Sequence, residues 1–161
     1  MRKSLLTSLL VTLACVLPAV SQAATKTTKV AGGEAQVITL LNQIRAQHNL
    51  PLFTANAQLR TAARAHSTNM LQKSYFDHNG PDGTWDTRIA RYLNSTLVGE
   101  NIAWGQGAYG TPAGIVDQWM HSPTHRAIIL TPGLKRVGIG LVQGSFQGAD
   151  AAVMATADFA A

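Results

Sequence analysis

The stretch Trp119-Met120-His121-Ser122-Pro123-Thr124-His125-Arg126 marks a junction between two helices. Serine is a preferred N-cap residue, and proline suits the first helical position, where its missing N–H would have no partner. We therefore expect one helix to end near Trp119 or Met120 and another to begin at Pro123. His125 falls in the first helical turn, where the dipole disfavours an imidazolium. Its neutral imidazole could accept a proton or bind a metal, or it could be an ordinary surface histidine.

Apolar residues at helical spacing predict further helices on the N-terminal side of this junction, and alternating residues predict two strands after it. Along the first of these strands, Val137, Ile139 and Leu141 lie on one face and glycines lie on the other. A helix could therefore pack closely against the glycine face. The alanines of the second helix would allow such an approach. The expected helices are Glu34 to Asn49, about Ala55 to Lys73 with Thr54 as its cap, Trp85 to Tyr92, and Thr111 or Pro112 to Met120, and the strands are Arg136 to Gln143 and Ala152 to Ala160.

The N-terminus has the pattern of an export signal. Arg2 and Lys3 precede an apolar run, and Ser21-Gln22-Ala23 resembles a cleavage site, so residues 1–23 are predicted to be a signal peptide. A retained membrane anchor is the competing interpretation, but the run is short for a span. Cleavage would remove Cys15, the only cysteine, and leave a secreted or periplasmic chain without disulfides or a transmembrane anchor. Residues 24–33 are expected to be a flexible leader, and 34–161 one domain.

Composition argues against two classes of ligand. The formal net charge of +5 would fall by two on loss of Arg2 and Lys3, and there is no basic run interleaved with aromatic residues, so nucleic-acid binding is not indicated. A weak attraction to anionic cell envelopes is compatible with this charge. The glycine-rich segment Gly105 to Gly110 lacks the Gly-Lys-Ser/Thr ending of a phosphate-binding loop, which argues against nucleotide binding.

Six short motifs follow one another along the chain. They are Leu41-Asn42-x-x-Arg45, Ala65-His66-Ser67-x-x-Met70, Phe76-x-His78, Gly99-Glu100-Asn101-Ile102-Ala103, Trp119-Met120-x-Ser122-Pro123-x-His125-Arg126 and Val137-Gly138-Ile139-Gly140. Together they resemble the bacterial branch of the CAP superfamily, which comprises cysteine-rich secretory proteins, antigen 5 and pathogenesis-related 1 proteins and is also known for its SCP-like extracellular domain. The resemblance covers essentially all of residues 34–161. It implies an α+β fold, an α-β-α sandwich with a small antiparallel sheet between helical layers.

The resemblance also implies a cleft lined by two histidines and two acids that binds a divalent cation such as Zn²⁺. His78 matches the first histidine, Glu100 the first acid and His125 the second histidine. The second acid is expected about three residues after the helix tryptophan, where this chain has Ser122. Two neutral imidazoles and one carboxylate could form an open zinc site. Without a metal, Glu100 would instead form a hydrogen-bonded pair with an imidazole.

Five further residues are predicted to line or support this cleft: His66, Ser122, Arg126, Trp104 and Asn101. His66 lies on the apolar stripe of its helix, which predicts a buried, hydrogen-bonded histidine. Ser122 could act as a nucleophile with His125, but its capping role competes with that function. The tryptophans are expected to form core and cleft walls, with sugar binding as an alternative.

Two classes of function remain open. The first is a non-catalytic extracellular binding module whose cleft holds a metal and a peptide, a lipid or an envelope glycan. The second is a metal-dependent hydrolase with Glu100 as the base and a zinc-bound water on His78 and His125. If a chelator abolished activity and zinc restored it, the protein would have to be a metal-dependent hydrolase.

Overall fold

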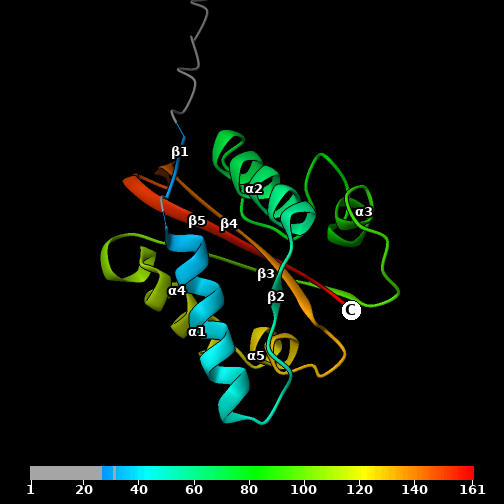
Figure 1. The fold of residues 1–161 in the computed structure, drawn as a ribbon. Helices are drawn as coiled ribbons and strands as arrows, with labels where there is room; N and C mark the ends of the chain where they lie inside the picture. The colour runs from blue at the N-terminus through cyan, green and yellow to red at the C-terminus, as the bar shows by residue number, and fades with distance from the viewer. Residues whose placement is uncertain (1–26, 31) are drawn as a thin grey trace, which may run out of the picture.

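The computed structural model describes residues 27–30 and 32–161, which form a three-layered α-β-α sandwich (Figure 1). The predicted signal peptide, residues 1–23, lies outside the described residues. The helices are α1 (Gly33–Gln47), α2 (Ala57–Gln72), α3 (Trp85–Ala90), the 3₁₀ turn η1 (Gly107–Gly110), α4 (Pro112–His121) and α5 (Pro123–Ile129). The strands are β1 (Thr28–Lys29), β2 (Thr54–Ala55), β3 (Val98–Gly105), β4 (Arg136–Phe146) and β5 (Ala149–Ala160).

Three long antiparallel strands make up most of the sheet, in the order β4-β5-β3. The two-residue strands β1 and β2 both pair with the other edge of β4, β1 antiparallel and β2 parallel. Strand β3 is thus an edge strand. The predicted α+β sandwich is confirmed, and the free edge of β3 becomes important for the site below.

The glycines of β4 set the distance between the sheet and α2. A Cβ atom built on Gly138 would lie 2.0 Å from the backbone nitrogen of Arg60, and one on Gly140 would lie 2.4 Å from the carbonyl carbon of Ala63. No side chain fits at either position, so the α2 backbone packs directly on β4. The opposite face of β4 carries Val137 and Ile139, which are fully buried in the core beneath α1 and α4.

Several element boundaries differ from the sequence-based expectation. Strand β4 continues to Phe146 rather than Gln143, and β5 begins at Ala149 rather than Ala152. Helix α2 is capped by Asn56, whose side chain accepts a hydrogen bond from the backbone N–H of Leu59 at 2.9 Å, whereas the expected cap, Thr54, belongs to β2. Thr28–Lys29, within the expected leader, pairs with β4 as β1. Strand β3 was not predicted as a strand. Strands β1 and β2 are too short to show an alternating pattern, and β3 is buried at five successive positions, which hides its alternation.

The Leu41-Asn42-x-x-Arg45 motif is a structural element. Asn42 accepts a hydrogen bond from the N–H of Phe53 at 2.7 Å and donates one to the Phe53 carbonyl at 3.0 Å. The fully buried Arg45 guanidinium donates to the carbonyls of Pro51, Ile129, Thr131 and Leu134 and lies 4.0 Å from the centre of the Phe53 ring. This side chain therefore joins α1 to the segment that follows α5.

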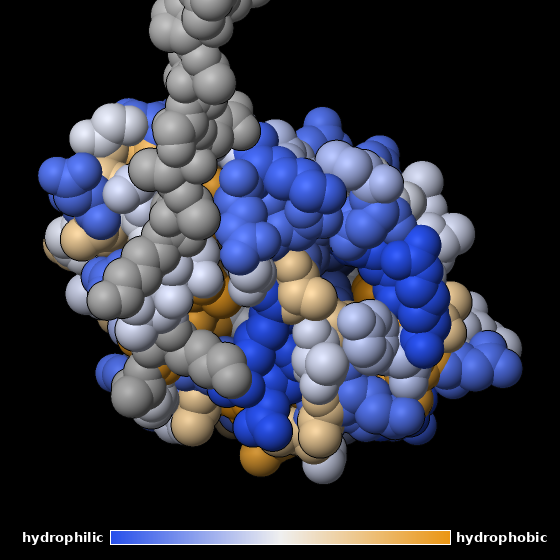
Figure 2. Space-filling view, turned by 90° about the horizontal axis from the view of Figure 1, so that it is seen from above, coloured by the Kyte–Doolittle hydropathy of each residue, from blue (hydrophilic) through white to orange (hydrophobic). Residues whose placement is uncertain are grey.

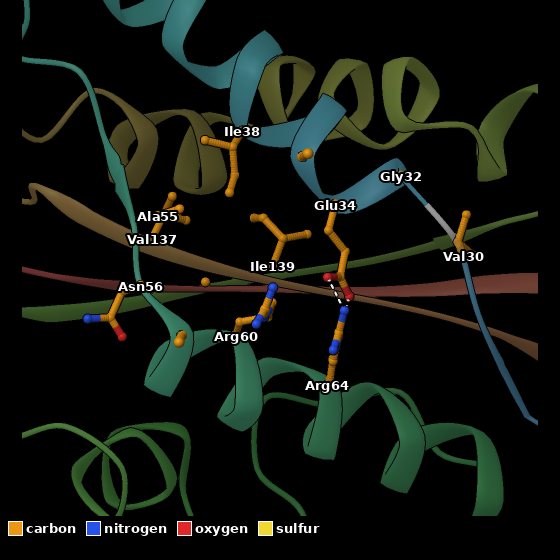
Figure 3. Close-up of a pocket in the computed structure, with 13 residues that line it drawn as sticks. Val30, Gly32, Glu34, Ile38, Ala55, Asn56, Arg60, Arg64, Val137 and Ile139 are labelled. Atoms are coloured by element: carbon orange, nitrogen blue, oxygen red, sulfur yellow. Dashed lines mark hydrogen bonds and ion pairs between the residues drawn. The ribbon is translucent and has the colours of Figure 1, made fainter.

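A pocket of about 610 Å³ opens between α1 and α2 over β4 (Figure 3). At one end, Glu34 of α1 and Arg64 of α2 point toward each other and form two hydrogen bonds of 2.6 and 2.5 Å. Glu34 also accepts from the backbone N–H of Leu141 at 3.3 Å. The pair thus fastens both helices to the edge of β4, and we assign it a structural role.

Hydrophilic residues cover much of the face seen in Figure 2, and hydrophobic ones show as scattered patches between them. Across the described part of the chain, no helix combines the length and the apolar character needed to span a bilayer.

Candidate functional site

The three residues predicted to form the cleft meet at the outer edge of β3. Glu100 lies on β3, His78 on the loop after α2, and His125 on α5, so the two imidazoles come from opposite helical layers. Their ring centroids are 6.3 Å apart, with a 37° angle between the ring planes. The free edge of the sheet thus lets both helical layers contribute to one site.

Glu100 is held from two sides. His78 Nδ1 lies 2.9 Å from Glu100 Oε1, and because a carboxylate can only accept, the imidazole donates this hydrogen bond. Arg88 of α3 donates from Nη2 to Glu100 Oε2 at 2.5 Å. The side chains of Arg88 and Glu100 are 5% and 1% exposed, which makes this a buried ion pair. Glu100 thus orients His78 and leaves its Nε2 free for a ligand.

Arg88 also fixes the loop that carries His78. Its Nη1 donates to the backbone carbonyls of His78 at 2.6 Å and Gly83 at 3.1 Å. One guanidinium therefore sets both the backbone and, through Glu100, the ring orientation of the histidine.

Asp158 of β5 lies directly opposite Glu100 in the β3–β5 register and is 2% exposed. Burial raises the pKa of Asp158 well above its ordinary value, and the negative charge of Glu100 adds to this effect. Both causes favour a protonated carboxyl group. The floor of the site is thus a row formed by Arg88, Glu100 and Asp158.

His125 is held through its backbone. The buried Asn101 side chain donates from Nδ2 to the His125 carbonyl at 3.1 Å. Burial, with a smaller contribution from His78, lowers the pKa of His125, so its imidazole is neutral at neutral pH. Its Nδ1 atom is buried and makes no hydrogen bond with the described residues.

His66 supports the site from behind, as its position on the apolar stripe of α2 predicts. It is fully buried, and its Nε2 lies 3.0 Å from the carbonyl of Asp77, the residue before His78. Burial is the largest cause that lowers the pKa of His66, which is therefore neutral as well. The histidine packs against Tyr75 and anchors the start of the loop.

Pockets lie on both sides of the histidine pair. One of about 560 Å³ is lined by His78 and Glu100, and another of about 230 Å³ by Trp104, Ser122 and His125. The predicted cleft residue Arg126 is exposed and lines neither pocket. Ser122 occupies the N-cap position of α5, but its hydroxyl forms no capping bond and lies 3.2 Å from Thr124 Oγ1. The hydroxyl is thus paired with a neighbouring threonine rather than with His125.

The donor set does not fit a three-ligand metal site. In residues 27–30 and 32–161, no three histidine, cysteine, aspartate or glutamate side chains are grouped so that they could hold one ion. Both oxygens of Glu100 are engaged, one by His78 and the other by Arg88. The arrangement fits a different role for the acid, because metal-binding histidines commonly donate their other ring N–H to a carboxylate. His78 and His125 are then the pair that could hold a cation.

Sequence reasoning missed Arg88 and Asp158. Asp158 carries a usable signal, since it is an acid within the apolar strand pattern Ala152 to Ala160, and buried acids are rare unless paired. Arg88 gives no such signal, because an arginine in a short helix is usually solvated.

Comparisons with known proteins agree with this architecture. The family model described as "Cysteine-rich secretory protein family" (CAP) matches residues 38–159. The uncharacterized protein YkwD of Bacillus subtilis (strain 168) is 36% identical over 112 residues, which are 68% of this chain and 42% of that protein. The uncharacterized membrane protein YlbC of the same organism is 28% identical over 110 residues, 67% of this chain and 31% of that protein. This chain therefore spans less than half the length of these curated relatives.

Solved structures share the fold. An extracellular protein containing a SCP domain from Bacillus anthracis str. Ames superimposes with a TM-score of 0.68 at 30% identity, over 80% of this chain and 40% of that one. An outer surface protein from Borrelia burgdorferi gives a TM-score of 0.73 at 15% identity, over 84% of this chain and 98% of that one. The family match over most of the chain and the shared sandwich show that this protein belongs to the CAP family.

Proposed function

We propose that this protein is an exported, non-catalytic binding module, whose cleft at the edge of β3 holds an extracellular or envelope ligand. The observation that carries the proposal is the pairing of His78 and His125 across the sheet edge, with His78 oriented by Glu100 and Arg88. Export is supported by the predicted signal peptide and by the extracellular relative from B. anthracis.

A divalent cation such as Zn²⁺ is the simplest ligand for the histidine pair. His78 would bind through Nε2, and His125 is neutral, as coordination requires. Two protein ligands are fewer than the three or four of dedicated zinc sites, so a bound ion would keep open positions for a second ligand. The cation would thereby link the module to a carboxylate, phosphate or imidazole of its partner.

The hydrolase alternative has less support. A general base needs a carboxylate oxygen within reach of a water, either directly or through one further water. Glu100 is 3% exposed, and its two oxygens are occupied by His78 and Arg88. The geometry supports an orienting role for Glu100 rather than a catalytic one.

Zinc titration calorimetry at neutral pH on residues 24–161 tests the proposal. We expect one equivalent of zinc to bind, and His78→Ala and His125→Ala each to abolish binding. His121→Ala is the matched control, because the His121 side chain is 79% exposed and lies outside the pair. Glu100→Gln should weaken binding by about 10- to 100-fold without abolishing it, as for other groups that orient a metal-binding histidine.

Absence of zinc binding, or binding that is indifferent to both histidine changes, would refute the cation site. Thermal unfolding of each variant would show that the fold is retained. Turnover of a peptide substrate that a chelator stops and zinc restores would favour the hydrolase instead.

A further inference from the structure

A further pocket, of about 520 Å³, lies at the C-terminal end of β3, next to the histidine cleft but distinct from it. Its wall combines two aromatic rings, Trp104 and Tyr109, with three glutamines, Gln106, Gln118 and Gln147. The rest is backbone of β3 and of the turn between β4 and β5. We call the pocket lined by these five side chains the aromatic-amide pocket.

The two aromatic rings are held in place. Trp104 packs edge-on against the buried Phe146, with ring centroids 5.1 Å apart and an angle of 74°. Tyr109 is 68% exposed, yet its backbone is fixed, because its carbonyl accepts a hydrogen bond from Gln118 Nε2 at 3.0 Å. A Cβ atom on Gly105 would lie 2.5 Å from that same carbonyl oxygen, so the 3₁₀ turn sits directly on the end of β3. An exposed ring on a rigid backbone is suited to contact a ligand.

The third side of the pocket is a tight hairpin turn. Phe146 and Ala149 are paired across a two-residue loop, and both loop residues have positive φ, 46° at Gln147 and 83° at Gly148. Positive φ at both positions is the signature of a type I′ turn, which fits the twist of the flanking strands. Figure 1 shows this hairpin and the end of β3 at the same end of the sheet. The turn thus presents Gln147 at a defined place.

The chemistry of the wall favours one class of ligand. None of the residues lining the pocket is charged, although the whole chain has a formal net charge of +5. The amides of the exposed Gln106 and Gln147 can both donate and accept hydrogen bonds, as sugar hydroxyls do, and a purely apolar ligand would leave them unpaired. Gln118 already donates to the carbonyls of Tyr109 and Gly114. Aromatic faces accept the C–H face of a pyranose ring. From these features we infer that the aromatic-amide pocket binds a neutral oligosaccharide.

The aromatic-amide pocket adjoins the histidine cleft. Trp104 and Gln118 also line the smaller pocket that contains His125. An oligosaccharide bound on Trp104 and Tyr109 would therefore extend toward His125. The inference rests on the proposed function in that it assigns a ligand class to a binding module, but it does not require a metal.

Binding of chitotetraose and cellotetraose, followed by calorimetry and by tryptophan fluorescence, tests the inference on residues 24–161 without added metal. We expect at least one of the two sugars to bind and to change the emission of Trp104, since Trp119 is fully buried and Trp85 does not line the pocket. Tyr109→Ala and Trp104→Ala should each weaken binding by about tenfold or more, as is typical of aromatic anchors.

Tyr92→Ala is the matched control, because Tyr92 is an exposed tyrosine outside the pocket and its removal should leave affinity unchanged. Zinc binding is measured separately from sugar binding, which is followed without added metal, so failure of the cation site and failure of the sugar site are distinguishable. If Trp104→Ala lowers thermal stability, Tyr109→Ala still tests the inference, because the Tyr109 side chain is exposed.

No binding of either sugar at millimolar concentration, or binding that survives both aromatic changes, would overturn the inference. Binding of sulfated oligosaccharides alone, lost at high salt, would also overturn it, because general charge attraction would explain it.

Discussion

The buried Arg88–Glu100 pair is the residue-level feature on which the site depends. An arginine in this pair neutralises a carboxylate that is almost fully removed from water, and it also holds the His78 backbone. Removing one partner of a buried pair leaves an uncompensated charge, which is far more costly than losing a surface pair.

We therefore expect Arg88→Met to lower the free energy of unfolding by about 3–5 kcal/mol. Urea denaturation measures this change. Arg91→Met, three residues away on an exposed side chain, should alter stability by less than about 0.5 kcal/mol. A similar small loss for both variants would mean that Glu100 is not a buried charge.

Asp158 gives a pH-dependent prediction. Because its folded-state pKa is raised, its contribution to stability is fully present below about pH 3.8 and is lost as the pH rises toward the raised pKa. Asparagine has the same shape without the charge. Asp158→Asn should therefore match the parent near pH 4 and be more stable than it at pH 7 by thermal unfolding.

Asp150→Asn, at an exposed position on the same strand, is the matched control and should change thermal stability little. If Asp158→Asn instead destabilises the protein at pH 7, the carboxyl group is ionised in the folded state and forms favourable contacts there.

At the scale of elements, the glycine face of β4 determines how close α2 lies. Gly140→Ala would place a methyl group 2.4 Å from the Ala63 carbonyl carbon, and backbone atoms cannot move aside as a side chain can. We expect a loss of about 1–3 kcal/mol or more in urea denaturation, as for overpacked cores.

Gly133→Ala is the matched control for this substitution. Its methyl group would meet only the far end of the exposed Leu97 side chain, so the free energy of unfolding should change little. Equal effects at the two glycines would show that close packing of α2 on β4 is not what constrains Gly140.

The helices were the elements best predicted from sequence, because each has a clear start or stop signal. The expected start at Pro123 and the expected end at Asn49 lie within about two residues of the observed helix ends, consistent with the usual uncertainty of helix boundaries. The cap of α2 was misplaced by two positions, since Thr54 and Asn56 are both good N-cap residues and only tertiary pairing of Thr54 with β4 separates them.

At the scale of the whole molecule, the site exists because β3 is an edge strand. His78 and His125 come from opposite layers and approach each other only where the sheet ends. The sequence identified His78, Glu100 and His125 through their family motifs, but not their geometry, because no short spacing enforces it. It therefore left open whether Glu100 binds a metal or pairs with an imidazole, and in the structure Glu100 pairs with His78 and Arg88.

The most direct measurement is the ¹⁵N NMR spectrum of the histidine imidazoles in residues 24–161 during a zinc titration. Before zinc, we predict that His78 is protonated at Nδ1, where it donates to Glu100. On addition of zinc, the ring nitrogens of His78 and His125 should shift together and saturate at one equivalent, while those of His48 and His121 stay unchanged. Independent shifts of His78 and His125, or shifts confined to His48 and His121, would contradict a shared cation site at the edge of β3.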